Sequence, residues 1–307
     1  MTNIQKEEIK ELIRAEKNRL GTFKAVAVKC KVSEPTISQL LNDAYLAKGD
    51  DMLLKIGLAL GYRFDDGSWQ IAETTDFKIV TGVLDDAKHE SMFIGISDVA
   101  GSGKTSAADV YLESNRRNSV YKINCKDWSG REFLLAMAKE IGAEMPKGYV
   151  KVSDLISSIS ATVKKISSSK PLVIIDQANS LKASALRTLI HIYNECEDIL
   201  GIVIMGAESL EYEIKKGVRL NRTGYDEIDS RFGRKYVKLV GATASDARMI
   251  CKMNGIEDAA LQDTIFRESE PVHHTLSGGR QILVIKDKRR LKRIIKRERL
   301  RLKQYGS

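Results

Sequence analysis

The residues with the clearest chemical meaning stand in a glycine-rich stretch between an apolar run and a predicted helix. Asp98-Val-Ala-Gly-Ser-Gly-Lys-Thr105 follows the apolar run Met92–Ser97 and precedes a helix that opens at Ser106. A turn of this kind lets consecutive backbone N–H groups surround phosphate oxygens at the positive end of a helix dipole. The stretch therefore predicts a nucleotide-phosphate site of the P-loop kind.

Most residues of this loop have a predicted role. Lys104 would reach the β- and γ-phosphates of ATP, where it would also assist catalysis, and the Thr105 hydroxyl would bind Mg²⁺. Asp98 stands where the P-loop pattern has its first glycine, which weakens the match without removing it. The residues expected to contact the nucleotide are Val99, Ala100, Gly101, Ser102, Gly103, Lys104, Thr105 and Ser106.

A second stretch, Leu172-Val-Ile-Ile-Asp176-Gln177, predicts a buried strand that ends in a carboxylate. Asp176 is expected to hold Mg²⁺ through its water shell, and the next residue, usually glutamate, polarises the attacking water. Gln177 can accept a hydrogen bond from water but cannot take its proton. We therefore expect nucleotide binding with impaired hydrolysis. Two interpretations remain, a naturally slow enzyme and a deliberate Glu→Gln change that traps the ATP state, and we favour the second.

Three arginines are candidates for contacts with the γ-phosphate. Arg231 and, as a reserve, Arg234 precede the last apolar run, where an arginine reaches the nucleotide of a neighbouring subunit. Arg280 follows two glycines and is expected to begin the final helix and to act on the nucleotide of its own chain. Surface salt bridges are the alternative for Arg231 and Arg234, and an ordinary solvated arginine after a glycine turn is the alternative for Arg280. A polar residue is expected after the run Gly201–Gly206, but Ala207 follows it.

The elements that must position these residues are predicted from the periodicity of the sequence. Short apolar runs alternate with amphipathic helices, which predicts an α/β core with a parallel sheet and helices on both faces. The predicted strands are Met92–Ser97, Val120–Asn124, Leu172–Asp176, Gly201–Gly206 and Tyr236–Val240. After Val240 the pattern is interpreted as helical only, which predicts a helical lid. Its helices are expected at Ser245–Asn254, at Glu257–Glu268 and from Arg280 onward.

The N-terminal segment has the layout of an all-α helix-turn-helix domain. Between Thr22 and Asn42, Ala27 lies in the first helix, Val32 in the turn, and Ser33 is the expected N-cap of the second helix. A helical packing module without DNA contact is the alternative. The side chains expected to point outward and to contact DNA are Thr36, Ser38 and Gln39.

Four segments are predicted along the chain. They are a helix-turn-helix domain at residues 1–65, a linker at 66–76, a nucleotide-binding core at 77–240 and a helical lid at 241–307. The four cysteines lack metal-binding spacing and are expected to be reduced packing residues. No run of eighteen apolar residues and no signal peptide is found, so we expect a globular, cytoplasmic protein without membrane contact.

The formal net charge of +9 is concentrated near the C-terminus. Between Lys286 and Lys303, eleven lysines and arginines stand against Asp287 and Glu298, so the rest of the chain is nearly neutral. Such a segment attracts nucleic acid through counterion release, although a solvated helix end is the alternative. The residues expected to contact DNA here are Lys288, Arg289, Arg290, Lys292 and Arg293.

These motifs, taken in order, resemble the phage Mu transposition protein B-like family of AAA+ ATPases, the helpers that select target DNA in transposition. The resemblance spans nearly the whole chain. It is carried by Thr22-Phe-Lys, Thr36-Ile-Ser, Gly103-Lys-Thr, Val173-Ile-Ile-Asp, Val203-Ile-Met-Gly and Ser230-Arg. The departures at Asp98, Gln177 and Ala207 bring the hydrolysis rate into question more than the fold.

The resemblance implies an AAA+ ATPase that uses ATP and Mg²⁺. It also implies a head-to-tail homo-oligomer that forms a helical filament on double-stranded DNA with little sequence preference. The filament would deliver target DNA to a transposase, whose stimulation of hydrolysis would dislodge it. The protein would act in the cytoplasm of a bacterial or phage-infected cell, in association with the nucleoid.

Two other functions share the same motifs. A helicase loader or replication initiator would have the same ATPase core, but the leading position of the helix-turn-helix disfavours it. An ATP-gated transcription regulator would read a specific operator. The absence of arginine and lysine between Ser33 and Asn42 disfavours this second alternative, because these side chains commonly read guanine.

Overall fold

The computed structural model describes residues 3–45, 49–60, 62, 69–115, 118–144, 148–276 and 278–305, without the side chains of 3–5, 303 and 305. The chain divides into two compact units, residues 1–69 and 70–307. Of the predicted linker, residues 66–76, the first three lie outside the described residues. Along the described part of the chain, no helix combines the length and apolar character needed to span a membrane.

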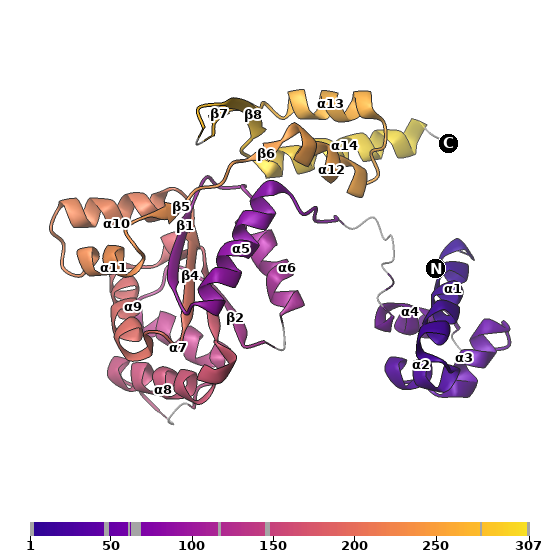
Figure 1. Ribbon diagram of the computed structural model, residues 1–307, viewed down its shortest axis with the longest axis horizontal. Helices are drawn as coiled ribbons and strands as arrows, with labels where there is room; N and C mark the ends of the chain where they lie inside the picture. Colours follow the sequence, from indigo (N-terminus) through magenta and orange to yellow (C-terminus); the bar gives the residue numbers. More distant parts are fainter. Residues whose placement is uncertain are drawn as a thin grey trace. The chain divides into compact units, whose positions relative to one another are not determined.

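The first unit is built from helices around a small apolar core (Figure 1). Ser33 caps the third helix as predicted, since its hydroxyl accepts a hydrogen bond from the Thr36 backbone N–H at 3.3 Å. The left-handed backbone of Lys31 closes the turn before it. Ile37 and Leu40 are buried, and Ser38 and Gln39 are exposed. The helices are α1 Asn3–Leu20, α2 Phe23–Cys30, α3 Glu34–Leu41 and α4 Gly49–Ala59.

The second unit contains a five-stranded parallel sheet with the strand order β2-β3-β4-β1-β5. The strands are β1 Phe93–Ser97, β2 Val120–Asn124, β3 Leu172–Asp176, β4 Gly201–Gly206 and β5 Tyr236–Val237. Helices cover both faces, as predicted, because the strands are apolar on both sides. On one face lie α5 Thr75–His89 and α6 Lys104–Ser114, and on the other α7 Gly130–Ile141, α8 Val152–Lys165 and α9 Ala183–Cys196.

Two further helices, α10 Ser209–Arg219 and α11 Tyr225–Arg231, connect β4 to β5. Short 3₁₀ helices occupy Ser167–Ser169 and Ala178–Ser180. Strand β5 is shorter than the predicted Tyr236–Val240. The reason is that the backbone N–H groups of Leu239 and Val240 donate to aspartate side chains instead of a neighbouring strand.

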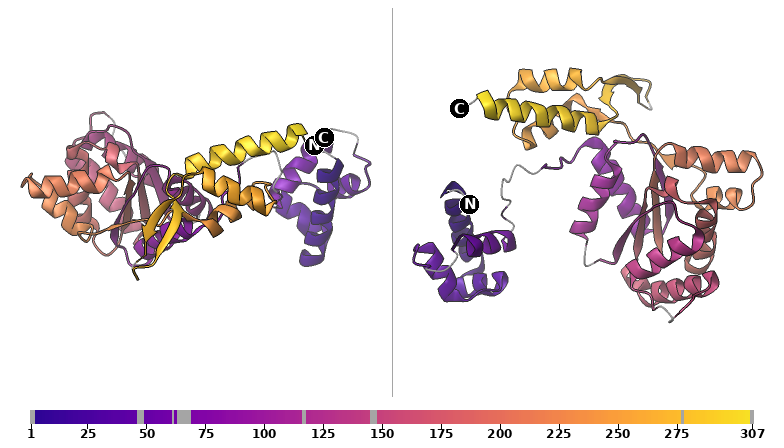
Figure 2. Two further views of the ribbon diagram at one scale, coloured as in Figure 1. Left: turned by 90° about the horizontal axis from the view of Figure 1, so that it is seen from above. Right: turned by 180° about the vertical axis from the view of Figure 1, so that it is seen from behind.

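The C-terminal part of this unit corrects one prediction. Helices α12 Ala244–Met253, α13 Ala259–Glu268 and α14 Lys288–Tyr305 are present, but they accompany a three-stranded antiparallel sheet, shown with α14 in Figure 2. Its strands are β6 Ala242–Thr243, β7 Val272–Thr275 and β8 Gln281–Ile285. The expectation of a helical-only lid was therefore wrong. Gly279, with a φ of +77°, lies in the turn of the β7–β8 hairpin, and glycine adopts such a backbone without strain.

All four cysteines are buried free thiols. Burial raises the pKa of Cys125 to about 12 and that of Cys251 to about 11. A thiol with so high a pKa is almost entirely protonated near neutral pH and is a poor nucleophile. These cysteines therefore act as apolar packing residues.

Candidate nucleotide site

The glycine-rich loop connects the end of β1 to the start of α6, in the strand–turn–helix arrangement that its sequence predicts. Gly101 and Gly103 have φ angles of +87° and +96°, which other residues rarely adopt. A side chain at Gly101 would also collide with the carboxylate of Asp287. The residues proposed for nucleotide contact, 99–106, thus share one loop and the first turn of one helix. The N-terminal turn of a helix presents N–H groups that suit phosphate oxygens.

Lys104, the first residue of α6, is buried beneath this loop. Its ammonium group donates to the carbonyl oxygens of Asp98 and Val99 at 2.9 and 3.0 Å, and to Ser102 Oγ at 2.9 Å. Burial lowers the pKa of Lys104, whereas the nearby carboxylates of Asp98 and Asp176 act in the opposite direction. The loop therefore holds a cation that is partly desolvated, which strengthens its attraction for phosphate.

Asp176 ends β3 and is buried. One carboxylate oxygen accepts a hydrogen bond from the Gln177 backbone N–H at 2.9 Å, while Oδ2 is buried and, among the described residues, has an ion pair with Lys122 at 3.3 Å but no hydrogen bond. An oxygen of this kind fits the water shell of Mg²⁺, which prefers oxygen donors. Thr105, the other predicted ligand, lies exposed in the first turn of α6. The donor set thus fits the metal that was predicted.

A lysine missed by the sequence analysis lies beside Asp176. Lys122 on β2 is buried, and its Nζ lies 3.3 Å from Asp176 Oδ2 and 2.5 Å from Asp109 Oδ1 on α6. It therefore links the helix of the phosphate loop to the predicted metal ligand. The sequence does contain a signal for this residue, since a lysine in a strand otherwise rich in apolar residues needs a buried partner.

Gln177 follows β3 in a left-handed conformation, with a φ of 57°, and its side chain is exposed. Two residues later, Asn179 Oδ1 accepts a hydrogen bond from the Ala207 backbone N–H at 3.0 Å. The Ser97 hydroxyl donates to the Ala207 carbonyl at 3.0 Å. Asn179 thus supplies a polar side chain at the end of β4, where the sequence offered only Ala207.

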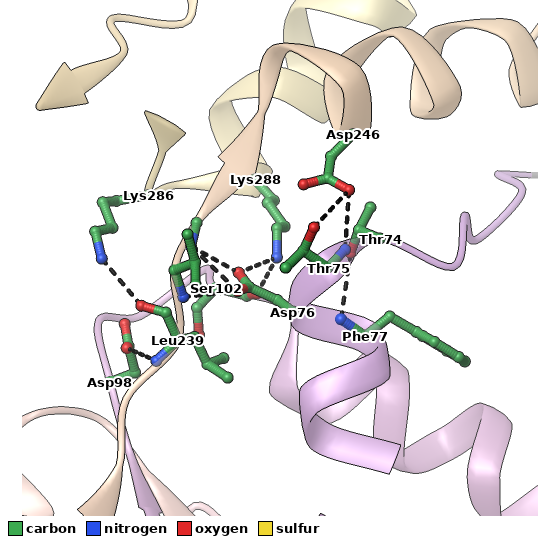
Figure 3. A network of polar contacts seen from close by, with 12 residues as sticks. Thr74, Thr75, Asp76, Phe77, Asp98, Ser102, Leu239, Asp246, Lys286 and Lys288 are labelled. Carbon is green, nitrogen blue, oxygen red and sulfur yellow. Dashed lines mark hydrogen bonds and ion pairs between the residues drawn. The ribbon is translucent and has the colours of Figure 1, made fainter. Parts of the chain in front are cut away.

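The start of α14 lies against the phosphate loop, which conflicts with the DNA contacts predicted for Lys288 and Arg289. The Lys288 backbone N–H donates to the Gly101 carbonyl at 3.0 Å, and its ammonium group to the Ser102 carbonyl at 2.7 Å. The same ammonium group forms an ion pair with Asp76 at 2.6 Å (Figure 3). A Cβ on Gly101 would lie 3.6 Å from Arg289 Cγ. These two cations thus lie at the loop because the final helix begins at Lys288.

Arg280 lies elsewhere than expected. It is exposed next to the turn of the β7–β8 hairpin, and its carbonyl accepts a hydrogen bond from the Leu276 backbone N–H. The expectation that Arg280 begins the final helix was wrong, because the glycines before it close a hairpin turn. Its contact with the nucleotide stays a prediction, and its place in the hairpin does not support that contact.

Arg231 ends α11 and Arg234 lies three residues beyond it, and the two have different surroundings. The Arg231 side chain is 19% exposed, and its Nη2 donates to Asn194 Oδ1 at 2.7 Å. Its guanidinium group also lies over the Tyr193 ring, 5.2 Å from the centroid. Arg234 is 51% exposed and forms an ion pair with Asp226 at 2.8 Å. Arg234 is therefore the more accessible of the two.

Beyond its first turn, α14 combines a buried apolar face with paired and exposed cations. Leu291, Ile294 and Ile295 are buried, whereas Leu302, expected on the same face, is exposed. Arg290 pairs with Glu270 at 2.5 Å, and Lys292 is half-buried with a partner. Arg293 and Lys296 are exposed and form no ion pair within the described part of the chain.

Known proteins resemble this chain in sequence. Residues 90–212 match the family described as "AAA domain". The ATP-dependent target DNA activator B of Escherichia phage Mu is 26% identical, over 79% of this chain and 74% of that protein. The similarity to phage Mu transposition protein B-like AAA+ ATPases, which the motifs suggested, is thus confirmed.

Two solved structures are similar at low identity. The crystal structure of Cdc6p from Pyrobaculum aerophilum has a TM-score of 0.44 and 12% identity, covering 63% of this chain and 52% of that one. The Aeropyrum pernix ORC1 protein in complex with DNA has a TM-score of 0.47 and 14% identity, covering 76% and 61%. The chain therefore spans less than two thirds of the length of these proteins.

The family match and the parallel sheet agree on the fold class. An AAA domain covers the phosphate loop, the Asp176 strand and the strand β4 between them in the sheet. This match indicates an ATPase of the AAA+ type, with the nucleotide binding that such a domain implies. The predicted fold class, an α/β AAA+ core with an all-α N-terminal part, is confirmed, whereas the C-terminal part adds a three-stranded sheet to its helices.

Proposed function

We propose that this protein is an ATP-dependent, largely sequence-nonspecific DNA-binding ATPase that forms filaments on duplex DNA and delivers it to a transposase. The observation that carries the proposal is the phosphate loop with buried Lys104 beneath it and Lys288 of the lid against it. The similarity to a protein named as an ATP-dependent target DNA activator supports the DNA part of the proposal.

The nucleotide is held by groups of one subunit. The N–H groups at the start of α6 bind phosphate oxygens, and Lys104 neutralises the β- and γ-phosphates. Mg²⁺, held by Thr105 and through water by Asp176, would supply positive charge between these phosphates when bound. Gln177 orients water through a hydrogen bond but does not remove its proton, so the subunit remains in its ATP form for longer.

The subunits stack head to tail through an arginine that reaches the next nucleotide. Arg231 was the first candidate, but its bond to Asn194 and its contact with Tyr193 occupy it within its own subunit. Arg234 is more exposed, and we now favour it. Replacing each arginine by alanine and measuring ATP-dependent assembly on DNA by sedimentation separates the two. Loss of assembly only with Arg231→Ala would contradict this preference.

DNA is contacted by two surfaces that we treat separately. The exposed side chains of α3, with the half-buried Thr36, face outward from the first unit as in a helix-turn-helix. The exposed cations of α14, among them Arg293 and Lys296, attract phosphates without reading the bases. Helix α3 offers no arginine or lysine of the kind that commonly reads guanine from a recognition helix, which agrees with low sequence preference.

The test is binding to long duplexes of random sequence with ATP and Mg²⁺, with ADP, or without nucleotide, followed by electron microscopy of negatively stained samples. We expect continuous coating of DNA with ATP alone, and none by the Lys104→Ala variant. Tight binding to one selected sequence would favour a transcription regulator. Closed rings at one origin-like site would favour a replication initiator. ATP-independent coating would contradict the proposed switch.

A further inference from the structure

The segment that connects the core to the lid is held by two buried aspartates. Asp98 Oδ2 accepts the Leu239 backbone N–H at 2.5 Å. Asp76 Oδ1 accepts the Val240 and Gly241 backbone N–H groups at 2.8 and 3.1 Å. Three consecutive N–H groups between β5 and β6 thus donate to carboxylates rather than to a strand (Figure 3). Residues 239–241 are called the joining segment below.

Both aspartates connect this segment to the phosphate loop. Asp98 is itself the first residue of the loop, and its carbonyl accepts a hydrogen bond from Lys104 Nζ at 2.9 Å. Asp76 reaches the loop through Lys288, whose ammonium group lies 2.6 Å from Asp76 Oδ2 and 2.7 Å from the Ser102 carbonyl. Each route from the loop to the joining segment therefore passes through one or two side chains.

The Asp98 carboxylate explains why the loop departs from the P-loop pattern at this position. A glycine at position 98 would have no side chain to accept the Leu239 N–H. Here the side chain is 4% exposed, and its other oxygen accepts the Val99 N–H at 2.7 Å. Hydrogen bonds to a buried carboxylate are stronger than those between neutral groups. With aspartate instead of glycine at position 98, the loop has a specific hydrogen bond to the joining segment, which leads to the lid.

Phosphate in the loop must compete with existing contacts of Lys104. All three N–H donors of its ammonium group are used, by the carbonyls of Asp98 and Val99 and by Ser102 Oγ. A phosphate that accepts one of these N–H groups would replace a hydrogen bond of Lys104 to the Asp98 carbonyl, the Val99 carbonyl or Ser102 Oγ. Its charge would also attract Lys288 and so compete with the ion pair between Lys288 and Asp76.

We propose that Asp98 is a positioning residue that couples the phosphate loop to the joining segment, so that the lid responds to the phosphate bound in the loop. The Asp76–Lys288 ion pair is the second connection between the phosphate loop and the joining segment. This inference rests on the proposed nucleotide binding and assigns to its site a means of transmission to the lid.

The test is hydrogen exchange of the full chain at peptides that cover residues 236–243, with and without ATP and Mg²⁺. In the parent protein, nucleotide should change exchange at the joining segment by about tenfold, the equivalent of one charge-assisted hydrogen bond. In Asp98→Gly, which restores the usual glycine, this response should fall below about twofold. Nucleotide affinity, measured by calorimetry, should stay within about threefold of the parent, because glycine is compatible with the loop.

A matched control removes a carboxylate that does not touch the joining segment. Asp85 on α5 accepts the Tyr111 hydroxyl at 2.8 Å, and Asp85→Asn should leave the response to nucleotide unchanged. Asp98→Asn retains one acceptor oxygen for Leu239 and should show an intermediate response. If Asp98→Gly does not fold, Asp76→Asn tests the second connection by the same readout.

The outcomes separate coupling from simple anchoring. Faster exchange in Asp98→Gly together with an undiminished response to nucleotide would make Asp98 a structural anchor and overturn the proposal. A parent protein that binds no nucleotide in calorimetry would overturn the proposed function and the coupling together. A parent that binds nucleotide without any change at the joining segment would overturn the coupling alone.

Discussion

The phosphate loop and helix α14 both concentrate positive charge, yet their cations have different surroundings. At the loop, Lys104 is buried and Lys288 is 14% exposed, and both ammonium groups donate to carbonyl oxygens. Along the rest of α14, Arg290 and Arg297 pair with glutamates at the surface, whereas Arg293 remains exposed. The number of cations in the sequence therefore overestimates the number on α14 that are available to bind DNA. It also underestimates how strongly a single buried lysine attracts phosphate.

The largest effect is expected for the buried cation of the phosphate loop, Lys104. Lys104→Ala should weaken ATP binding by about 10²-fold or more, because the loss includes at least one charge-assisted hydrogen bond in a desolvated site. Calorimetry with ATP and Mg²⁺ measures it. Lys164→Ala, which removes a lysine paired with Glu195 at the surface, should leave the affinity unchanged. Equal affinities for both variants would remove Lys104 from the site.

The next effect concerns hydrolysis. Gln177→Glu should raise ATP turnover by about 10²-fold, the usual contribution of general-base assistance, without tightening ATP binding. The measurement is steady-state phosphate release with and without duplex DNA. Asn179→Asp is a useful companion, because it adds a carboxylate two residues away and should not restore turnover. An unchanged rate in Gln177→Glu would mean that position 177 does not polarise water.

A smaller effect is expected for the exposed cations. The double variant Arg293→Ala/Lys296→Ala should lower DNA affinity and reduce the slope of log affinity against log salt by about 2, since each phosphate contact contributes about 0.9. The control is Arg290→Ala/Arg297→Ala, whose cations are held by Glu270 and Glu268. Its slope should change less. Equal slopes for the two double variants would show that pairing does not decide which cations bind DNA.

The smallest effect concerns the cation beside the predicted metal ligand. Lys122 lies 3.3 Å from Asp176 Oδ2, so its charge opposes Mg²⁺ at the same carboxylate. Lys122→Met should lower the Mg²⁺ concentration needed for half-maximal ATP binding by about threefold. A titration with a fluorescent ATP analogue measures this, and binding in EDTA is the control. A higher Mg²⁺ requirement would instead indicate that Lys122 orients Asp176 for the metal.

The central parts of the fold could be predicted because their signals are local. The phosphate loop is recognised from eight consecutive residues, and four of the five strands begin and end within one residue of their apolar runs. The β7–β8 hairpin was missed although Gly278-Gly279 before the apolar run Ile282–Ile285 is a hairpin signal. The basic segment that follows has helical periodicity, and the sequence alone does not show where this helix begins.

The contacts across the site could not be predicted because their partners are remote in sequence. Asp98 and Leu239 are separated by 141 positions, and Ser102 and Lys288 by 186. No periodicity or motif links such pairs. The exposed or paired state of each cation in α14 depends likewise on Glu268 and Glu270, which lie on and just after α13. Sequence patterns identify the chemical groups here, while the tertiary fold decides which of them meet.

The strand order has a consequence for how the chain is made. Strand β1 lies between β4 and β5, which begin at Gly201 and Tyr236, so it has no neighbour until most of the chain has left the ribosome. Pairings that are this remote in sequence form slowly, because a long loop must first be closed. The contacts of Lys288 with the loop come later still. We therefore expect that ATP cannot assist the early stages of folding and that newly made chains depend, until β4 emerges, on the packing of α5 and α6 to protect the apolar residues of β1.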